Sequence, residues 1–129
     1  MKIAAAILRD PRGRTLLVQD PGAHDTVLFS RMWQFPAVEV TRHAKTELAA
    51  HLSNTLSITN ISLEALPAAR HGVTFRNITL LPFLASLSEL PKLPRTRILP
   101  LKDLANLPIS SATRKIAAAL TAVSILPAL

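Results

Sequence analysis

The alternation of apolar and polar residues divides the first third of the chain into short strands. Two strand-like segments, 2–8 and 15–19, flank the sequence RDPRGR, whose Asp-Pro and Gly residues favour a tight turn. This pattern predicts a hairpin. The sequence DPGAHD is typical of a loop, and TVLFSRMWQFPAVEV predicts two short strands around Trp33 and Phe35.

A helix is predicted in the middle of the chain. An apolar stripe with a spacing of four residues is formed by Ala44, Leu48, Leu52 and Leu56. Thr41 precedes this stripe and can cap a helix from about Arg42 to Leu56.

Further strands are predicted after this helix. Segment 58–66 is typical of a strand or an extended connection, and segments 70–76 and 78–86 are typical of strands. Continuous apolarity from Ile78 to Leu84 indicates burial on both faces, although Pro82 weakens the case for a central strand.

The last third contains shorter elements. After the proline-rich loop SELPKLPRT, the sequence TRILPL predicts a strand and KDLANLP a small helix or turn. Ser110 or Ser111 then caps a final helix whose apolar face is formed by Ile116, Leu120 and Val123. The pattern as a whole predicts an α+β fold, a mixed sheet packed with a mid-chain helix and a C-terminal helix.

Composition limits the class of protein. A length of 129 residues fits a single domain over 1–129, and the lack of cysteine excludes disulfides, thiolate zinc sites and iron–sulfur clusters within this chain. The net charge of +7 favours nucleic acid or another polyanion as a partner, with a merely solvated basic surface as the alternative.

Neither terminal segment has the features of a targeting signal or a membrane span. Arg9 and Asp10 end the first apolar run too early for a signal peptide, and Pro127 interrupts the apolar tail. We therefore expect a soluble cytoplasmic protein.

Common catalytic motifs are absent from the sequence. The glycines at 13, 22 and 72 build neither a Walker loop nor a dinucleotide fingerprint, and no G-x-S-x-G elbow occurs. His43 and His51 lie eight residues apart, which disfavours a metal pair on one helix. Glu39 and Glu47 can act in acid–base chemistry or be purely structural, and one helix carboxylate cannot build a multi-ligand magnesium site.

Two aromatic residues have the same parity on a predicted strand. Trp33 and Phe35 therefore share one face, where they can pack in the core or stack on a nucleobase. A second polar stretch, RHGVTFRNITLLPF, places hydrogen-bonding side chains directly before an apolar strand.

The segment LLVQDPG…LFSRMWQFPAVEV resembles the part of Nudix-fold proteins in which a Trp-x-Phe-Pro sequence leads into the Nudix helix. In active Nudix hydrolases Gly follows that proline, and the helix carries an Arg-Glu-x-x-Glu-Glu cluster that binds magnesium. Here Ala37 follows Pro36 and the helix reads RHAKTELAAHLSNTL. The resemblance therefore implies loss of pyrophosphate hydrolysis.

Over nearly its whole length the chain is similar to the C-terminal Nudix-like domain of MutY-family adenine DNA glycosylases. The similar segments are Met32 to Pro36, the stretch HGVTFRNITL, and an LP-x-x-x-x-x-RK sequence at Leu107 to Lys115. This resemblance implies a non-catalytic domain that helps recognise 8-oxoguanine opposite adenine in base excision repair.

The resemblance implies that Thr74 contacts the lesion, because a hydroxyl both donates and accepts hydrogen bonds. Val73 replaces the family's usual Phe, Phe75 replaces its His, and His71 matches its first His. With this resemblance, 71–76 is interpreted as a loop that faces damaged DNA, and Arg70 and Arg76 would add a basic face beside it. The expected lesion-binding residues are therefore Thr74, Val73, Phe75, His71, Arg70 and Arg76.

The resemblance also implies partners for this domain. These are double-stranded DNA with an 8-oxoguanine:adenine mispair and an N-terminal glycosylase domain of the same protein, from which this chain would be excised. We expect no cofactor and no metal here, an iron–sulfur cluster in the glycosylase domain, no enzymatic activity of this chain alone, and a nucleoid-associated location in a bacterial cytoplasm. The alternatives are a Nudix-type nucleoside diphosphate hydrolase with a divergent metal site, and a protein-interaction module that uses the tail Ile125 to Leu129.

Overall fold

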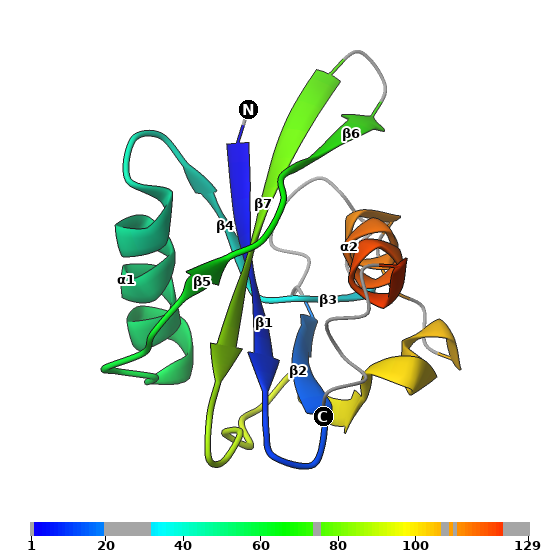
Figure 1. Ribbon diagram of the computed structural model, residues 1–129. Coiled ribbons are helices and arrows are strands. Elements are labelled where there is room, and N and C mark those ends of the chain that lie inside the picture. Colours follow the sequence, from blue (N-terminus) through cyan, green and yellow to red (C-terminus); the bar gives the residue numbers. More distant parts are fainter. Residues whose placement is uncertain (1, 20–31, 74–75, 107–108, 110, 123–129) are drawn as a thin grey trace.

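A computed structural model describes residues 2–19, 32–73, 76–106, 109 and 111–122. These residues form a mixed eight-stranded sheet with one helix against each face (Figure 1). The predicted α+β fold is therefore confirmed. The strands are β1 Lys2–Arg9, β2 Arg14–Gln19, β3 Trp33–Gln34, β4 Ala37–Val40, β5 Glu64–Ala65, β6 Ala69–Val73, β7 Arg76–Ser86 and β8 Thr96–Pro100. The helices are α1 Ala44–Leu56, the short 3-10 helix η1 Leu101–Asn106, and α2 Ser111–Ala122.

The centre of the sheet is the parallel pair β1 and β7, in register from Lys2 opposite Thr79 to Arg9 opposite Ser86. The other edge of β1 pairs antiparallel with β4 along its first residues and with β2 at its end. Antiparallel strands β3 and β8 extend the sheet beyond β2. Strands β5 and β6 form the outer edge beside β7.

Two apolar cores lie on opposite faces of this sheet because successive residues of β1 point to opposite sides. Ala4, Ala6 and Leu8 pack with the α1 stripe of Leu48, Leu52 and Leu56, which confirms the predicted helix face. On the other face, Ala5 and Ile7 pack with residues of β2, β7 and α2, among them Leu17, Leu80 and Ile116.

The predicted burial of β7 on both faces is confirmed, since Phe83 belongs to the α1 core and Leu84 to the α2 core. Pro82 is tolerated because of its orientation. Its carbonyl accepts the N–H of Leu66 at 2.9 Å, and the N–H and C=O of one strand residue point to the same side. The donor that proline lacks would thus face the outer edge, not β1.

Several element boundaries differ from the predictions. The helix begins at Ala44 instead of Arg42, and of segment 58–66 only Glu64–Ala65 forms a strand. Segment 70–76 is divided between β6 and β7. Ser111 is the first residue of α2 and Ile116 is buried, whereas Ser110 and Val123 lie outside the described residues.

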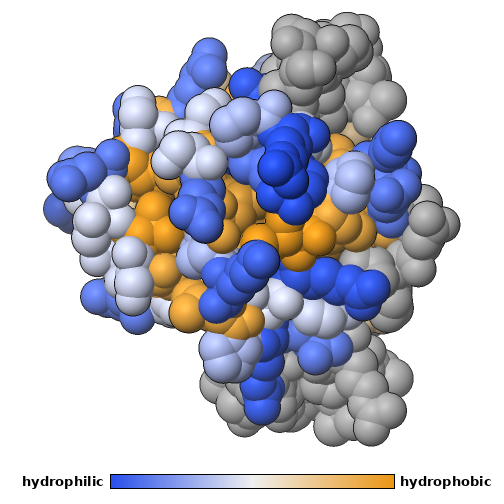
Figure 2. Space-filling model, turned by 90° about the horizontal axis from the view of Figure 1, so that it is seen from below, coloured by the Kyte–Doolittle hydropathy of each residue, from blue (hydrophilic) through white to orange (hydrophobic). Residues whose placement is uncertain are grey.

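The hydropathy of the surface varies across the face that is seen from below in Figure 2. Figure 2 shows an apolar band there, bordered by hydrophilic residues. Across the described ranges, Leu93 is the large apolar residue that stands out as exposed, at 38%. No helix within those ranges is long and apolar enough to cross a membrane.

Candidate functional site

The segment between β3 and β4 borders two pockets, both lined by Gln34 and Ala37. One pocket opens on the side of α1 and the other on the side of α2. They differ in size, since the α1-side pocket encloses about 440 Å³ and the α2-side pocket about 220 Å³. Because Gln34 and Ala37 belong to both linings, this segment borders one pocket on each side of the sheet.

The α1-side pocket combines polar side chains from three parts of the chain. His51 and Thr55 come from α1, Gln19 from the end of β2, and Arg95 and Thr96 from the segment that enters β8. Burial lowers the pKa of His51 from its ordinary value of 6.5, because a less polar environment disfavours the imidazolium ion. The imidazole is thus neutral at pH 7 and can accept a proton.

The backbone of Arg95 is in the left-handed region, with φ of 63°. This conformation is uncommon for a residue with a β-carbon. Its carbonyl accepts the N–H of Gln19 at 2.9 Å, which fixes the β8 entry against the end of β2. The Arg95 backbone is therefore held in place beside the pocket, and its side chain is exposed.

The α2-side pocket is mainly apolar. Ile3, Leu80 and Ile116 contribute to its floor, while Glu39 and Thr113 add polar groups. The Oγ1 atom of Thr113 accepts the backbone N–H of Phe35 at 3.2 Å in a buried hydrogen bond. This bond ties α2 to the segment that separates the two pockets.

Glu47 holds the start of α1, a role that the sequence assigned to Thr41. His43 is the N-cap residue, and no side chain of the N-cap closes the helix. Instead the Glu47 carboxylate accepts N–H bonds from Thr41 at 3.2 and 3.3 Å, from Arg42 at 3.2 Å and from His43 at 2.9 Å. The Thr41 hydroxyl donates a further bond at 3.4 Å. The predicted Thr41 cap is therefore wrong.

These contacts lower the pKa of Glu47 below its ordinary value of 4.5. The N–H of His43 contributes most to this lowering. Desolvation opposes it as the next largest effect, and the N–H groups of Thr41 and Arg42 keep the net shift downward. Glu47 is therefore an anion at neutral pH, and its carboxylate oxygens already accept hydrogen bonds from the backbone.

A carboxylate-bound magnesium ion does not fit the residues of α1. The Arg-Glu-x-x-Glu-Glu spacing, started at Glu47, falls on Ala50 and His51, which leaves one carboxylate. Nowhere in the described ranges do three or more His, Cys, Asp or Glu side chains gather as metal ligands. We therefore derive no chemical step through such an ion.

The two aromatic residues near the pockets belong to the α2-side core. Phe35 is 1% exposed, and Trp33 is partly buried against the same cluster. The core-packing alternative is thus the correct one for Phe35. Its ring is too enclosed to stack on a nucleobase.

The predicted lesion-binding residues lie along the β6–β7 hairpin. Arg70, His71 and Val73 belong to β6, and Arg76 is the first residue of β7, paired with Val73. The interpretation of 71–76 as a loop is therefore wrong, because only two residues separate the strands. Those residues, Thr74 and Phe75, lie outside the described part of the chain.

Sequence reasoning missed the α1-side pocket. His51 drew attention only as half of a metal pair, and Arg95 belongs to a proline-rich loop with no motif. They line one pocket because β8 pairs with β2 while α1 packs on the same face. Only a correct strand order could have revealed this.

No family model and no curated protein matches the sequence. Solved structures do match. The MutT protein from Methanosarcina mazei Go1 has a TM-score of 0.79 at 14% identity, over 97% of this chain and 95% of that one. The MutT Nudix hydrolase from Burkholderia pseudomallei has a TM-score of 0.72 at 19% identity, over 91% and 95%. The C-terminal domain of mouse MUTYH, solved with human PCNA, has a TM-score of 0.69 at 24% identity, over 89% and 83%.

This chain therefore has a Nudix-like fold. The comparisons also correct one expectation from the sequence, namely that the chain by itself is not an enzyme. Proteins named as hydrolases share its fold across at least nine-tenths of its length. The altered helix alone was insufficient ground for excluding catalysis.

Proposed function

We propose that this chain is a Nudix-type hydrolase that cleaves a phosphate anhydride of a nucleoside phosphate with a divergent catalytic site. The observation that carries this proposal is the pair of pockets that share Gln34 and Ala37 in their linings. Both linings are largely apolar, but the α1-side pocket adds the imidazole of His51 and the guanidinium of Arg95. A nucleoside phosphate has a base that fits an apolar lining and anionic phosphates that fit a cationic one.

The α1-side pocket supplies two chemical functions. The neutral imidazole of His51 takes a proton from a water molecule as its oxygen attacks phosphorus, and the bond to the bridging oxygen breaks. The bridging oxygen leaves with the departing phosphate, and His51 returns its proton to solvent. The guanidinium of Arg95 can pair bidentately with phosphate oxygens, which balances the charge that develops there.

The α2-side pocket would hold the base. Gln34 lines both pockets, so its amide is available to orient the ligand at the junction. An amide offers a donor and an acceptor to the edge of a nucleobase.

A nucleotide panel tests this proposal. Release of phosphate and pyrophosphate from nucleoside di- and triphosphates would be followed with added magnesium and with EDTA. His51→Gln should lower kcat by about 100-fold or more, which is the usual contribution of a general base. His43→Gln is the matched control, since His43 is an exposed residue at the start of the same helix. No turnover of any nucleotide, or equal rates for both variants, would refute the proposal.

A second candidate is recognition of 8-oxoguanine:adenine mispairs by the β6–β7 hairpin. Its support is the similarity to the MUTYH C-terminal domain and a hairpin in which Thr74 and Phe75 separate two paired strands. Thr74→Ala should reduce the preference for an 8-oxoguanine:adenine duplex over a guanine:adenine duplex in a fluorescence titration. The exposed Thr59 gives the control Thr59→Ala. An unchanged preference in Thr74→Ala removes this candidate.

A further inference from the structure

The turn between β1 and β2 is rigidly built and rich in arginine. The N–H of Gly13 donates to the carbonyl of Asp10 at 3.1 Å, and the N–H of Asp10 donates to the carbonyl of Arg14 at 3.1 Å. Gly13 has φ of 76°, which glycine adopts without steric cost. Pro11 restricts φ at the first position of the turn.

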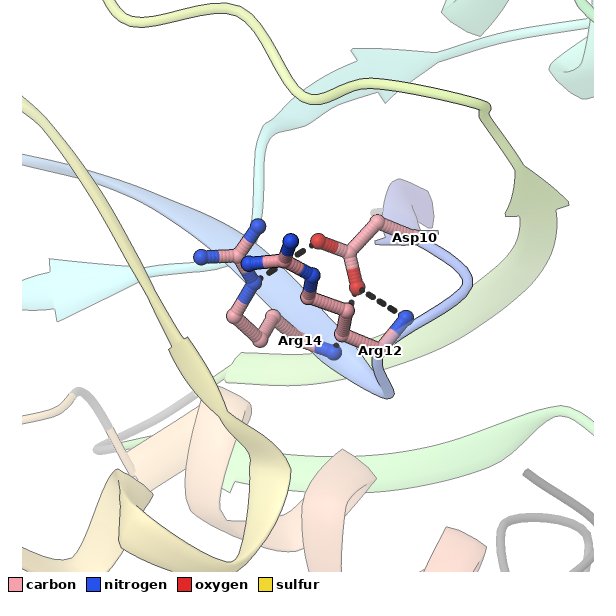
Figure 3. A network of polar contacts seen from close by, with 3 residues as sticks. All are labelled: Asp10, Arg12 and Arg14. Carbon is pink, nitrogen blue, oxygen red and sulfur yellow. Dashed lines mark hydrogen bonds and ion pairs between the residues drawn. The ribbon is translucent and has the colours of Figure 1, made fainter.

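Asp10 organises this turn from within. Its side chain is 3% exposed, and Oδ1 accepts the N–H of Arg12 at 3.0 Å and of Arg14 at 2.9 Å. Oδ2 accepts Nε–H of Arg14 at 2.8 Å, which is also an ion pair (Figure 3). Burial alone would raise the pKa of Asp10, but these hydrogen bonds outweigh it and lower the pKa below 3.8.

The Asp10 carboxylate thus bonds to donors within the turn, while positive charge remains at the surface. Arg9, Arg12 and Arg14 against Asp10 leave the segment 9–14 with a net charge of +2. Figure 3 shows the side chains of Arg12 and Arg14 extending in the same direction from the turn. Within the described part of the chain, the Arg12 guanidinium has no hydrogen-bond or ion-pair partner. The ion pair fixes Arg14 through Nε and leaves its Nη edge for another acceptor.

We propose that this arginine turn binds the phosphodiester backbone of a nucleic acid. Guanidinium groups recognise phosphate oxygens through paired N–H donors. The Arg14 guanidinium is already held by Asp10 and loses little freedom on binding, while the Arg12 guanidinium is available to a phosphate. The excess of basic residues over the whole chain, 15 against 8 acidic ones, favours a polyanion over a single anion. An anionic membrane fits less well, because Leu93 stands nearly alone as an exposed large apolar residue among those described.

This surface is independent of both candidates above. The turn follows Arg9, which pairs with Ser86 at the far end of β7 from Arg76. The intervening 11 residues of β7 span roughly 35 Å, so the turn and the tip of the β6–β7 hairpin lie at opposite ends of the sheet. The turn also contributes no lining residue to either pocket. Failure of the hydrolase proposal would leave it unaffected.

The test compares Arg12→Gln with Arg42→Gln in the whole chain. Arg42 is an exposed arginine two residues after Val40, which pairs with Lys2 at the opposite end of β1. Fluorescence anisotropy with a short labelled duplex, from 50 to 200 mM salt, gives affinity and salt slope. Arg12→Gln should weaken binding about tenfold at low salt and reduce the salt slope by about one. Arg42→Gln should change neither.

A second variant keeps the result interpretable. Arg14→Lys preserves the charge beside Asp10 but removes the forked donors, so it should weaken duplex binding with little change in the thermal midpoint. Three outcomes overturn the proposal. They are no binding of duplex by the unaltered chain, equal behaviour of Arg12→Gln and Arg42→Gln, or preferential binding to phosphatidylserine vesicles over duplex.

Discussion

Two carboxylates organise two turns of this molecule, and they do so in different surroundings. Asp10 closes the β1–β2 turn from a buried position and has a guanidinium partner. Glu47 closes the β4–α1 junction from the surface of the helix and accepts only backbone N–H groups and one hydroxyl. Both carboxyl groups have a lowered pKa. The comparison teaches that a carboxylate can be occupied by donors of its own turn, whether or not it is buried.

The difference in burial should decide which turn depends more on its carboxylate. Asp10→Ala removes a buried carboxylate that accepts part-buried hydrogen bonds from the N–H groups of Arg12 and Arg14 and from Nε–H of Arg14. We expect the free energy of unfolding to fall by about 2–4 kcal/mol, toward the lower value because the Arg14 side chain is 38% exposed. Urea denaturation measures this. Asp103→Ala is the control, and equal losses in both variants would contradict the assignment.

Thr113 is a buried hydrogen-bond acceptor without charge, so a substitution there separates the contribution of hydrogen bonding from that of charge. Thr113→Val removes the hydroxyl that accepts the Phe35 N–H but keeps the side-chain shape. The free energy of unfolding should fall by about 1–2 kcal/mol, because a buried donor is left unsatisfied. The same denaturation experiment on Thr113→Ser, which retains the hydroxyl, should show a smaller loss. The reverse order would mean that methyl packing matters more than the hydrogen bond.

The smallest effect is expected at Glu47, where water can replace a lost acceptor. Its folded-state pKa is below 4.5, so the carboxylate stabilises the fold above that pH and this stabilisation is lost as the pH falls through the folded-state pKa. Glu47→Gln should therefore lower the thermal midpoint at pH 7 by less than Asp10→Ala does, and the gap to the unaltered protein should close toward pH 3.

Thermal melts over this pH range check the prediction, with Glu64→Gln as a control on the exposed strand β5. A gap that stays constant with pH would show that the charge of Glu47 does not hold the junction.

Local patterns predicted the parts of the fold that local forces determine. The Asp-Pro and Gly positions gave the β1–β2 hairpin, and the leucine spacing gave the buried face of α1. The role of Glu47 could not be predicted, because its carboxylate accepts the N–H groups of residues 41–43, and the path of this segment depends on how β4 ends. The proximity of His51 to Arg95 depends on strand order, which no local pattern encodes.

The outer edge of the sheet, where Leu66 pairs with Pro82, has a kinetic consequence. Pro67 and Ala68 lie between this pair and Ala69 opposite Leu80, so two residues face Leu81 alone and the edge is bulged. Strand β6 therefore shares no uninterrupted ladder with β5, and among the described strands it pairs with β7 alone. Amide protons of β6 can exchange with solvent through a local opening of this edge, while the pairing of β1 with residues 79–86 of β7 stays closed.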